Sequence, residues 1–428
     1  MPASAVFSSL IFAVSLAFIL SEKIHRSIVG IAGAVLMVGI GKIFGFYSEE
    51  AALDAIDFNT LGLLLGMMIL VAMLEPTGFF QYIAVGAARV SRGKPVRLFI
   101  LLGSITTVLS MFLDNVTTVV LIAPVTILIC EILGVSPLPY LIAEALLSNT
   151  GGVATLVGDP PNVLIGSAAG LSFNDFLIHS LPIVAVAWVA TLFLLRYLFR
   201  DELSKIPGNA EAVMSLNPAE SLDDPKTARR VLVILGVAIF LFFVHHTLHI
   251  SPSFIAVSTA AVALVWVQPD IKKTFERVEW SVLIFFSALF VMVGGLEAAG
   301  VLEGIVSLLD GLSRIPPLWF GVSLIWIVAV LSAVVDNIPI TIALIPVIQG
   351  LGDTGMDITP LWWALAFGAG FGGNGTIIGS TANIIVVSLS EKTRTPITSS
   401  IWNRRGLPVM LVTCAIASVL YIFFFRAF

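Results

Sequence analysis

Two Asp-Asn pairs stand inside long hydrophobic segments, and their side chains are the best suited to chemistry. The pairs are Asp114-Asn115 and Asp336-Asn337, one in each half of the chain. A carboxylate costs roughly 2.5–3.5 kcal/mol at the centre of a membrane helix, so such a residue is usually functional or paired. An Asp can exchange a proton with a competing cation, or it can cap the helix that follows it. Both roles stay open for Asp114 and Asp336.

A glycine-rich motif, GGxxTxxGxxxN, also occurs twice, at 151–162 and 372–383, with nearly the same spacing between its copies as between the Asp-Asn pairs. In the first copy Pro160 and Pro161 remove backbone donors, and in both copies the glycines lower the cost of leaving a helix. These glycines are Gly151, Gly152, Gly158, Gly372, Gly373 and Gly379. Unpaired backbone groups are tolerated at membrane depth only inside protein or beside a water-filled cavity. The motif therefore predicts an interrupted membrane helix in each half, which is where transporters commonly hold their solute.

Neutral polar side chains surround these pairs and motifs, and they suit a cation or a hydroxylated neutral solute. The candidates for solute binding are Asn115, Thr117, Thr118, Thr155, Asn162, Asn337, Thr341, Asn374, Thr376, Ser380 and Asn383. The alternative is that they satisfy the backbone groups that the interruptions free. Ser380 stands where the first half has Asp159, so the two halves should differ chemically. The candidate proton-coupling residues are Asp114, Asp159, Asp336 and Glu144, which all lie in apolar surroundings.

The composition indicates what must position these residues. The chain has 428 residues, of which 58% are hydrophobic and 11% charged, and its mean hydropathy is +1.04. These values indicate an integral membrane protein, and the long apolar runs predict an all-α fold. Ten spans are expected near 4–21, 27–44, 59–75, 138–170, 177–196, 230–247, 252–268, 280–297, 360–391 and 406–426, of which 138–170 and 360–391 are the interrupted ones. The segments at about 97–134 and 317–350 are each divided by an Asp-Asn pair and are expected to be hairpins that enter and leave on one side.

The distribution of basic residues supports this span list. With an external N-terminus, all of the 22 Lys and Arg residues fall in cytoplasmic segments except Lys42, Arg314 and Arg426. We therefore expect a protein of the inner membrane with both termini on the periplasmic side. The polar segment 201–228 is interpreted as a cytoplasmic linker between two repeats, 1–200 and 229–428, that are inverted relative to each other.

Several other functions are disfavoured by what the sequence lacks. Cys130 and Cys414 are too few for a thiolate metal site, and no phosphate-binding GxxxxGK[ST] loop or nucleophile motif is present. We expect no enzymatic activity, no cofactor and no nucleic-acid partner. Neither interruption contains Lys or Arg, which favours a neutral hydroxylated solute over an organic dianion.

The motifs Asp114-Asn115-Val116-Thr117-Thr118, Gly158-Asp159-Pro160-Pro161-Asn162, Asp336-Asn337-Ile338-Pro339 and Gly372-Gly373-Asn374-Gly375-Thr376 carry a family resemblance. Over nearly its whole length, the chain resembles the ArsB/NhaD branch of the ion transporter superfamily. It is also similar to the pink-eyed dilution P protein and, in its plan of hairpins and broken helices, to the divalent anion/sodium symporters. The resemblance implies an inverted-repeat fold, a site between hairpin tips and broken helices, and often a dimer with an elevator-like movement. The symporters have Ser-Asn-Thr at their hairpin tips, whereas this chain has Asp-Asn.

Together these patterns predict a secondary transporter that exports arsenite or antimonite, coupled to proton influx. The alternative is a Na⁺/H⁺ antiporter of the NhaD type, and a passive channel or an anion permease ranks below both. The expected partners are the small solute, protons and the lipid bilayer, with a homodimer and a soluble ATPase subunit as further candidates.

Overall fold

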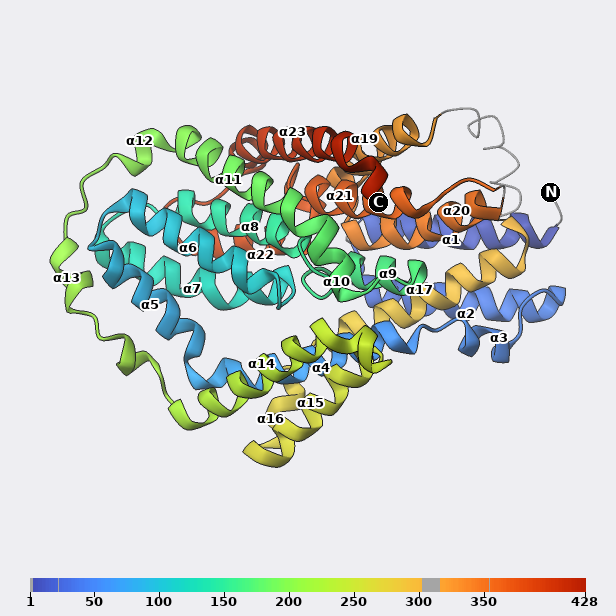
Figure 1. Cartoon of the computed structure of the whole chain (residues 1–428), viewed down its shortest axis with the longest axis horizontal. Coiled ribbons are helices and arrows are strands. Elements are labelled where there is room, and N and C mark those ends of the chain that lie inside the picture. The colour runs from blue at the N-terminus through green and yellow to red at the C-terminus, as the bar shows by residue number, and fades with distance from the viewer. Residues whose placement is uncertain (1–2, 22, 302–315, 354) are drawn as a thin grey trace.

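The computed structural model describes residues 3–21, 23–301, 316–353 and 355–428. This part of the chain consists of helices and irregular connections and contains no strand, as the composition predicts. Eight of its helices are long and apolar enough to cross a membrane, and shorter apolar helices lie among them. The chain is therefore a multi-pass membrane protein with an all-helical fold (Figure 1).

The first half contains long helices, one hairpin and one broken helix. Its elements are α1 (Ala3–Ser21), α2 (Arg26–Phe44), α3 (Glu49–Asp54), α4 (Phe58–Leu74), η1 (Glu75–Thr77), α5 (Phe79–Ser91), α6 (Pro95–Ser110), α7 (Asn115–Leu133), α8 (Leu138–Gly152), α9 (Pro160–Ala169), α10 (Phe173–Asp175), the π-helical turn η2 (Phe176–Ser180) and α11 (Leu181–Leu198). Helices α6 and α7 form the hairpin, because Asp114 ends the turn between them and caps α7. Helices α8 and α9 are the two parts of the broken helix.

The second half repeats this order. Its elements are α14 (Pro225–Leu248), α15 (Pro252–Val267), α16 (Ile271–Glu276), α17 (Trp280–Ala298), α19 (Pro317–Val334), α20 (Asn337–Asp353), α21 (Thr359–Gly372), η5 (Ile377–Gly379), α22 (Thr381–Ser390), α23 (Ser399–Phe424) and η6 (Phe425–Ala427). Helices α19 and α20 form the second hairpin, and α21 and α22 are the second broken helix. The hairpin α6–α7 lies at the left of Figure 1 and α20 at the right. The predicted all-helical fold with two hairpins and two broken helices is confirmed.

The segment between the halves is short-helical and polar. It contains α12 (Arg200–Leu203), α13 (Ala210–Ser215) and η3 (Pro218–Ser221), and it follows one edge of the molecule in Figure 1. It separates α11 from α14, where the sequence places a linker. The repeat boundaries at residues 200 and 229, and the side of the membrane on which this segment lies, stay predictions.

Equivalent hydrogen bonds hold each hairpin against its broken helix. Ser110 Oγ on α6 donates to the Ser148 carbonyl at 2.7 Å, and Ser332 Oγ on α19 donates to the Ala369 carbonyl at the same distance. Past the ends of α8 and α21, Thr155 Oγ1 donates to the Met111 carbonyl, and Thr376 Oγ1 donates to the Ala333 carbonyl. Each of these residues is separated from its counterpart by the spacing of the sequence motifs, so the repeated motifs form repeated structure.

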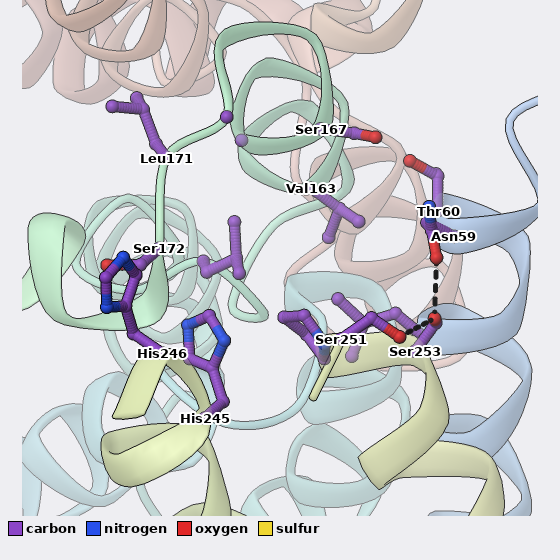
Figure 2. Close-up of a pocket in the computed structure, with 15 residues that line it drawn as sticks. Asn59, Thr60, Val163, Ser167, Leu171, Ser172, His245, His246, Ser251 and Ser253 are labelled. Atoms are coloured by element: carbon purple, nitrogen blue, oxygen red, sulfur yellow. Dashed lines mark hydrogen bonds between the residues drawn. The ribbon is translucent and has the colours of Figure 1, made fainter. Parts of the chain in front are cut away.

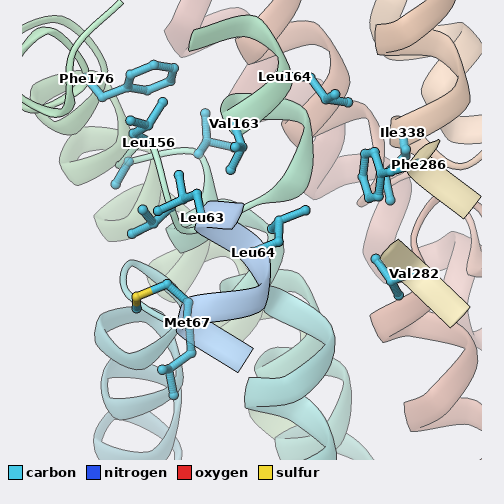
Figure 3. Close-up of a cluster of buried hydrophobic side chains, with 14 of the residues drawn as sticks. Leu63, Leu64, Met67, Leu156, Val163, Leu164, Phe176, Val282, Phe286 and Ile338 are labelled. Carbon is cyan, nitrogen blue, oxygen red and sulfur yellow. The ribbon is translucent and has the colours of Figure 1, made fainter. Parts of the chain in front are cut away.

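An apolar layer packs the first break against α4 and α17. Leu63, Leu64 and Met67 from α4 lie near Leu156, Val163 and Leu164 of the break, with Val282, Phe286 and Ile338 completing the same cluster (Figure 3). Apolar contacts are non-directional, so a surface of this kind can hold the broken helix without fixing one register. The layer places the polar end of α9 close to the start of α17 and to the tip of the second hairpin.

Candidate functional site

The glycines of the repeated motif serve close packing as well as the interruption. Gly151, Gly152 and Gly372 are still helical, and the chain leaves the helix directly after them. A Cβ at Gly151 would lie 2.5 Å from the Thr107 carbonyl oxygen, and one at Gly372 would lie 2.6 Å from the Ala329 backbone. Only glycine therefore allows α8 and α21 to approach the hairpin helices this closely.

Gly158 and Gly379 have the same function inside the two breaks, where they face Gly152 and Gly373. A Cβ at Gly158 would lie 2.6 Å from the Gly152 carbonyl oxygen, and one at Gly379 would lie 2.8 Å from the Gly373 carbonyl oxygen. Each break is therefore a tight loop folded onto the helix end before it.

Two asparagines satisfy the carbonyl groups that the breaks free. Asn162 Nδ2 donates to the carbonyls of Gly152, Val153 and Thr155 at 3.1, 3.2 and 2.8 Å. Asn383 Nδ2 donates to the carbonyls of Gly373 and Thr376 at 2.7 and 2.9 Å. Buried carbonyls need such partners because they have no water. The structure thus places both amide groups, and the hydroxyls of Thr155 and Thr376, on the protein's own backbone.

The hairpin tips and the breaks meet around a small central cavity of about 20 Å³. Its lining comprises Arg26, Met68, Asp114, Asn115, Val116, Asp159, Pro160, Glu279, Val282, Asp336, Asn337, Ile338, Ser380 and Thr381. A space of roughly 10–15 Å³ is enough for one water molecule, so in this conformation the cavity has room for a water or a small ion. The three aspartates predicted to couple protons therefore share one site, together with Asn115, Asn337 and Ser380.

The two halves of the site are chemically different, as the exchange of Asp159 for Ser380 predicts. Asn337 Nδ2 donates to both carboxylate oxygens of Asp159, at 3.1 and 3.4 Å. Its counterpart Asn115 donates instead to the Asn149 amide oxygen at 3.0 Å, and Ser380 Oγ donates to the same oxygen at 3.0 Å. The acceptor is thus ionisable on one side of the cavity and neutral on the other.

Asn149 is the centre of a buried amide network that sequence reasoning missed. Its Nδ2 donates to Asn374 Oδ1 at 3.1 Å and to Asn383 Oδ1 at 3.0 Å, and Asn374 Nδ2 reaches Thr150 Oγ1 at 3.3 Å. With the two bonds that its oxygen accepts, all four hydrogen-bonding positions of the Asn149 amide are occupied. The network ties the first broken helix to the second, so it fixes how the halves meet.

Arg26 is the most consequential residue that the sequence placed elsewhere. The basic-residue distribution puts it in a loop, but the structure has it at the start of α2 with its side chain in the site. One guanidinium nitrogen lies 2.8 Å from Asp336 Oδ2 and 2.9 Å from Thr381 Oγ1, and the Thr381 hydroxyl donates to the same Asp336 oxygen at 2.9 Å. The guanidinium carbon is 5.5 Å from the ring centroid of Phe285. The only clue in the sequence is that Arg26 directly precedes a span.

The position of Arg26 corrects one sequence argument. Neither interruption contains a basic residue, yet a guanidinium group is bound to the second hairpin tip and to the second broken helix. Arg26 and Asp336 are only about one-fifth exposed, with side-chain fractions of 22% and 19%. The absence of Lys and Arg from the motifs therefore does not make the site neutral.

Asp114 lines the cavity and is also the cap of α7, so the capping role is observed and the proton-coupling role stays a prediction. Its carboxylate accepts hydrogen bonds from the backbone N–H of Thr117 at 2.9 Å and from the Thr117 hydroxyl. Asp336 accepts from the Ile338 N–H at 3.4 Å, so its capping bond is weaker and its main partners are Arg26 and Thr381.

Nine of the predicted solute-binding and proton-coupling residues lie outside the lining of the central cavity. Five of them bond to the backbone or to Asp114 as described above: Thr117, Thr155, Asn162, Thr376 and Asn383. The other four have different surroundings. Thr341 donates to the Asn337 carbonyl at 2.8 Å within α20, and Asn374 belongs to the amide network. Thr118 is buried and its hydroxyl has no partner among the described residues. Glu144 is fully buried between α7 and α8, where one oxygen accepts from Thr126 Oγ1 at 2.5 Å and the other has no partner in the described part of the chain. Its role as a proton carrier stays a prediction.

Two larger cavities adjoin the central one. The first, of about 260 Å³, has Arg26, Asp336 and Thr381 in its wall together with His25. The second, of about 240 Å³, shares Met68 and Glu279 with the central cavity. Both cavities therefore share wall residues with the site.

A third cavity, of about 250 Å³, shares no lining residue with the central one. It lies between α4, α9, α14 and α15 and is lined by polar groups that include Asn59, His245 and Ser253 (Figure 2). Ser253 Oγ donates to Asn59 Oδ1 at 2.8 Å. Among the described residues, no group of three or more His, Cys, Asp or Glu side chains is placed to hold a metal ion.

Comparison with known proteins identifies the wider group. The chain matches the sequence model of the family described as citrate transporter (CitMHS) over residues 16–368. It is 38% identical over 425 residues to a 46 kDa membrane protein of Mycobacterium leprae, with 97% of each sequence covered. It is 32% identical to the human P protein, with 94% of this chain and 57% of that protein covered.

One solved structure is similar in fold. The YdaH transporter of Alcanivorax borkumensis aligns with a TM-score of 0.56 and 16% identity, over 94% of this chain and 99% of that one. The expected similarity to the P protein is confirmed, while the narrower assignment to the ArsB/NhaD branch stays a prediction. The chain belongs to the citrate transporter family and is a membrane transporter.

Proposed function

We propose that this protein is a proton-coupled secondary transporter of a small anion, in which Arg26 binds the anion and Asp336 binds the proton. The observation that carries the proposal is the 2.8 Å ion pair between these two residues, which both line the central cavity. Among the described residues, Arg26 is the one cationic group in the lining, where it faces four carboxylates. A guanidinium is well suited to carboxylates and oxyanions, because its planar fork donates parallel hydrogen bonds.

Proton binding and anion binding are linked by this pair. When Asp336 is ionised, it occupies the guanidinium and the Thr381 hydroxyl, so an anion must compete with a carboxylate that is already in place. When Asp336 is protonated, the ion pair loses its Coulomb attraction, and Arg26 becomes available to an incoming anion. The proton and the anion therefore bind together, which is the requirement for symport.

The same ion pair joins two parts of the protein. Arg26 is on α2, whereas Asp336 and Thr381 are on the second hairpin tip and the second broken helix. Any movement of hairpin and broken helix past α2 must break these bonds. Proton binding at Asp336 would therefore both prepare the site and release the movement, as an elevator-like mechanism needs.

The substrate class follows from the guanidinium and is supported by the description of the family as a citrate transporter. The prediction of arsenite or antimonite as neutral trihydroxides depends on the absence of basic groups, and Arg26 removes that support. These metalloids are kept as competing solutes in the test. Placement in the inner membrane with both termini outside, a homodimer and a soluble ATPase partner also stay predictions.

Exchange of Na⁺ for protons is the second candidate, because four carboxylates line the cavity against one guanidinium. Within the described ranges of the chain, however, these carboxylates are not gathered closely enough to hold a metal ion. A cation site would therefore need the hairpin tips to close further.

The test uses the full chain in proteoliposomes with an imposed pH gradient. We expect labelled citrate or a smaller carboxylate to accumulate when the entry side is acidic, independently of Na⁺, and to show saturation and counterflow, which a channel lacks. Arg26→Met should abolish accumulation, whereas Arg230→Met, which removes an arginine that is exposed on α14, should not. Proton release evoked by Na⁺, or accumulation of arsenite without that of carboxylates, would reject the proposal.

A further inference from the structure

Glu279 lies at the boundary between the central cavity and the neighbouring cavity of about 240 Å³, and it lines both. We call this neighbouring space the Glu279 cavity. Glu279 occupies the N-cap position of α17, yet its side chain accepts no capping hydrogen bond. The usual structural reason for an acidic residue at a helix start is therefore missing here. No hydrogen bond or ion pair engages its carboxylate among the described residues, so the group is available to face the cavities.

Charged groups surround Glu279 on both sides. Toward the central cavity it interacts electrostatically with the Asp114 carboxylate and the Arg26 guanidinium. Toward the Glu279 cavity the wall contains Thr117, Glu75 and Arg277, and Arg277 Nε lies 3.6 Å from Glu75 Oε2. Glu75 and Arg277 thus form an ion pair with each other. Among the described residues of this wall, Glu279 is the carboxylate without an ion-pair partner.

The two cavities that adjoin the site differ in their charged groups. The wall of the 260 Å³ cavity contains the ion pair of Arg26 and Asp336. The wall of the Glu279 cavity contains the pair of Glu75 and Arg277 and, in addition, the unpaired carboxylate of Glu279. An anion therefore meets a balanced ion pair in the first cavity and one excess negative charge in the second. A carboxylate in the wall of a water-filled cavity can take up a proton from that water and release it again.

We propose that Glu279 is a proton-transfer residue and that protons reach the site through the Glu279 cavity, separately from the solute. The carboxylate of Glu279 takes a proton from water in that cavity and passes it, by way of the Asp114 carboxylate, to Asp336 across the central cavity that all three residues line. Each transfer makes one O–H bond and breaks another, and no other reactant is needed. The inference rests on the proposed proton coupling and adds a defined path and residue to it.

The first test is Glu279→Gln, which keeps the size and polarity of the side chain but cannot carry a proton. We expect accumulation driven by a pH gradient to fall by about a hundredfold or more, since positioned proton-transfer groups contribute factors of this order. Counterflow, which needs no net proton movement, should fall far less than accumulation does, because Glu279 lines the cavity but makes no hydrogen bond to Arg26, Asp336 or Thr381 among the described residues. The matched control is Glu276→Gln, on α16 and exposed.

Two results of this test would overturn the inference. Accumulation of solute by Glu279→Gln at the wild-type level would show that the carboxylate moves no required proton. Loss of counterflow together with accumulation would assign Glu279 to solute binding or folding. If the wild type itself shows no proton-driven accumulation, the proposed function fails instead, and the two failures are thereby distinguished.

The second test asks whether the Glu279 cavity contains water. With Cys130 and Cys414 replaced by Ala, Val120→Cys places a thiol in the cavity wall, and Val108→Cys places one on α6 away from it. The native side chains are similarly exposed, at 42% and 53%. A charged, membrane-impermeant thiol reagent should label the Val120 position in proteoliposomes and spare the Val108 position. No labelling at Val120 would overturn the proposed path.

Discussion

Asp336→Asn is the substitution that most clearly separates proton coupling from solute binding. In the structure the Asp336 carboxylate receives the Arg26 guanidinium at 2.8 Å, the Thr381 hydroxyl at 2.9 Å and the Ile338 N–H at 3.4 Å. An amide keeps the shape and one acceptor oxygen but is always neutral. The variant therefore imitates the protonated state of Asp336 at every pH.

The size of the effect follows from the bonds that change. The guanidinium still donates a charge-assisted hydrogen bond to the amide oxygen, so the substitution removes only the Coulomb attraction between the two charges. This attraction ranges from about 1 kcal/mol in bulk water to about 4 kcal/mol near a protein surface. We take the lower end of this range because both side chains are about one-fifth exposed, which allows solvent screening. Since about 1.4 kcal/mol corresponds to a factor of ten, Arg26 should become available to an anion about fivefold more often.

The assay combines equilibrium binding with transport. In detergent, wild-type affinity for the transported anion should rise as the pH falls, whereas Asp336→Asn should bind with the higher affinity at every pH. In proteoliposomes the variant should retain counterflow and lose accumulation driven by a pH gradient. The control Asp270→Asn, at the exposed N-cap of α16, should behave as wild type. If Asp336→Asn bound the anion with wild-type pH dependence, the linkage between this carboxylate and Arg26 would be wrong.

Three further substitutions test the scaffold and the remaining carboxylate. Asn149→Ala should lower the unfolding free energy by at least about 2 kcal/mol, because buried partners left unpaired cost about 1–3 kcal/mol each. Its control is Ser148→Ala, which removes only a hydrogen bond within α8. Equal stability of the two variants in mixed micelles would contradict the network. Gly372→Ala should lower the unfolding free energy by about 1–3 kcal/mol, because the added Cβ forces α21 away from α19. Gly86→Ala should leave the stability unchanged, because its Cβ would meet nothing within 4 Å. A stable, active Gly372→Ala protein would refute the close approach. Glu144→Gln can still accept the threonine hydroxyl of α7, so we expect unchanged thermal stability and lost gradient-driven accumulation if its proton is part of the cycle, and full accumulation would remove it from the coupling residues.

The sequence is informative about the fold because its signals are local. The hairpins expected near 97–134 and 317–350 occur as α6–α7 and α19–α20. Asp114 and Asp336 mark the turns at which the chain reverses direction in these hairpins. The broken helices expected at 138–170 and 360–391 also occur, because glycine and proline act on the backbone at their own positions. Repetition of both motifs at nearly one offset made the pairing of hairpin and break predictable.

The composition of the site was less predictable because it depends on contacts between distant segments. Arg26 and Asp336 come from opposite halves of the chain. A hydropathy pattern assigns Arg26 to a loop, because it locates the apolar segments of the sequence and does not report where a side chain points. Glu279 similarly looks like a capping residue at the start of a span. Asn149 has no counterpart in the second repeat, where Gly370 stands, so the motif comparison passes over it.

The neutral candidates divide according to what their side chains bind. Asn115, Asn337 and Ser380 line the cavity, whereas Asn162 and Asn383 are engaged by backbone carbonyls. Asparagine occurs in both groups, in the Asp-Asn pairs of the first and in the glycine-rich motifs of the second. Their roles differ because only the first group lies at a hairpin tip or directly before a new helix, where the side chain points into the space between the halves.

The most direct test of the account is to run the coupling in reverse. Proteoliposomes loaded with the transported carboxylate, diluted into a medium without it at equal pH on both sides, should lose protons together with the anion, and a trapped pH dye should report an alkaline interior. The alkalinisation should be absent in Arg26→Met. Anion efflux with no change in internal pH would contradict the claim that Arg26 and Asp336 bind anion and proton as one event.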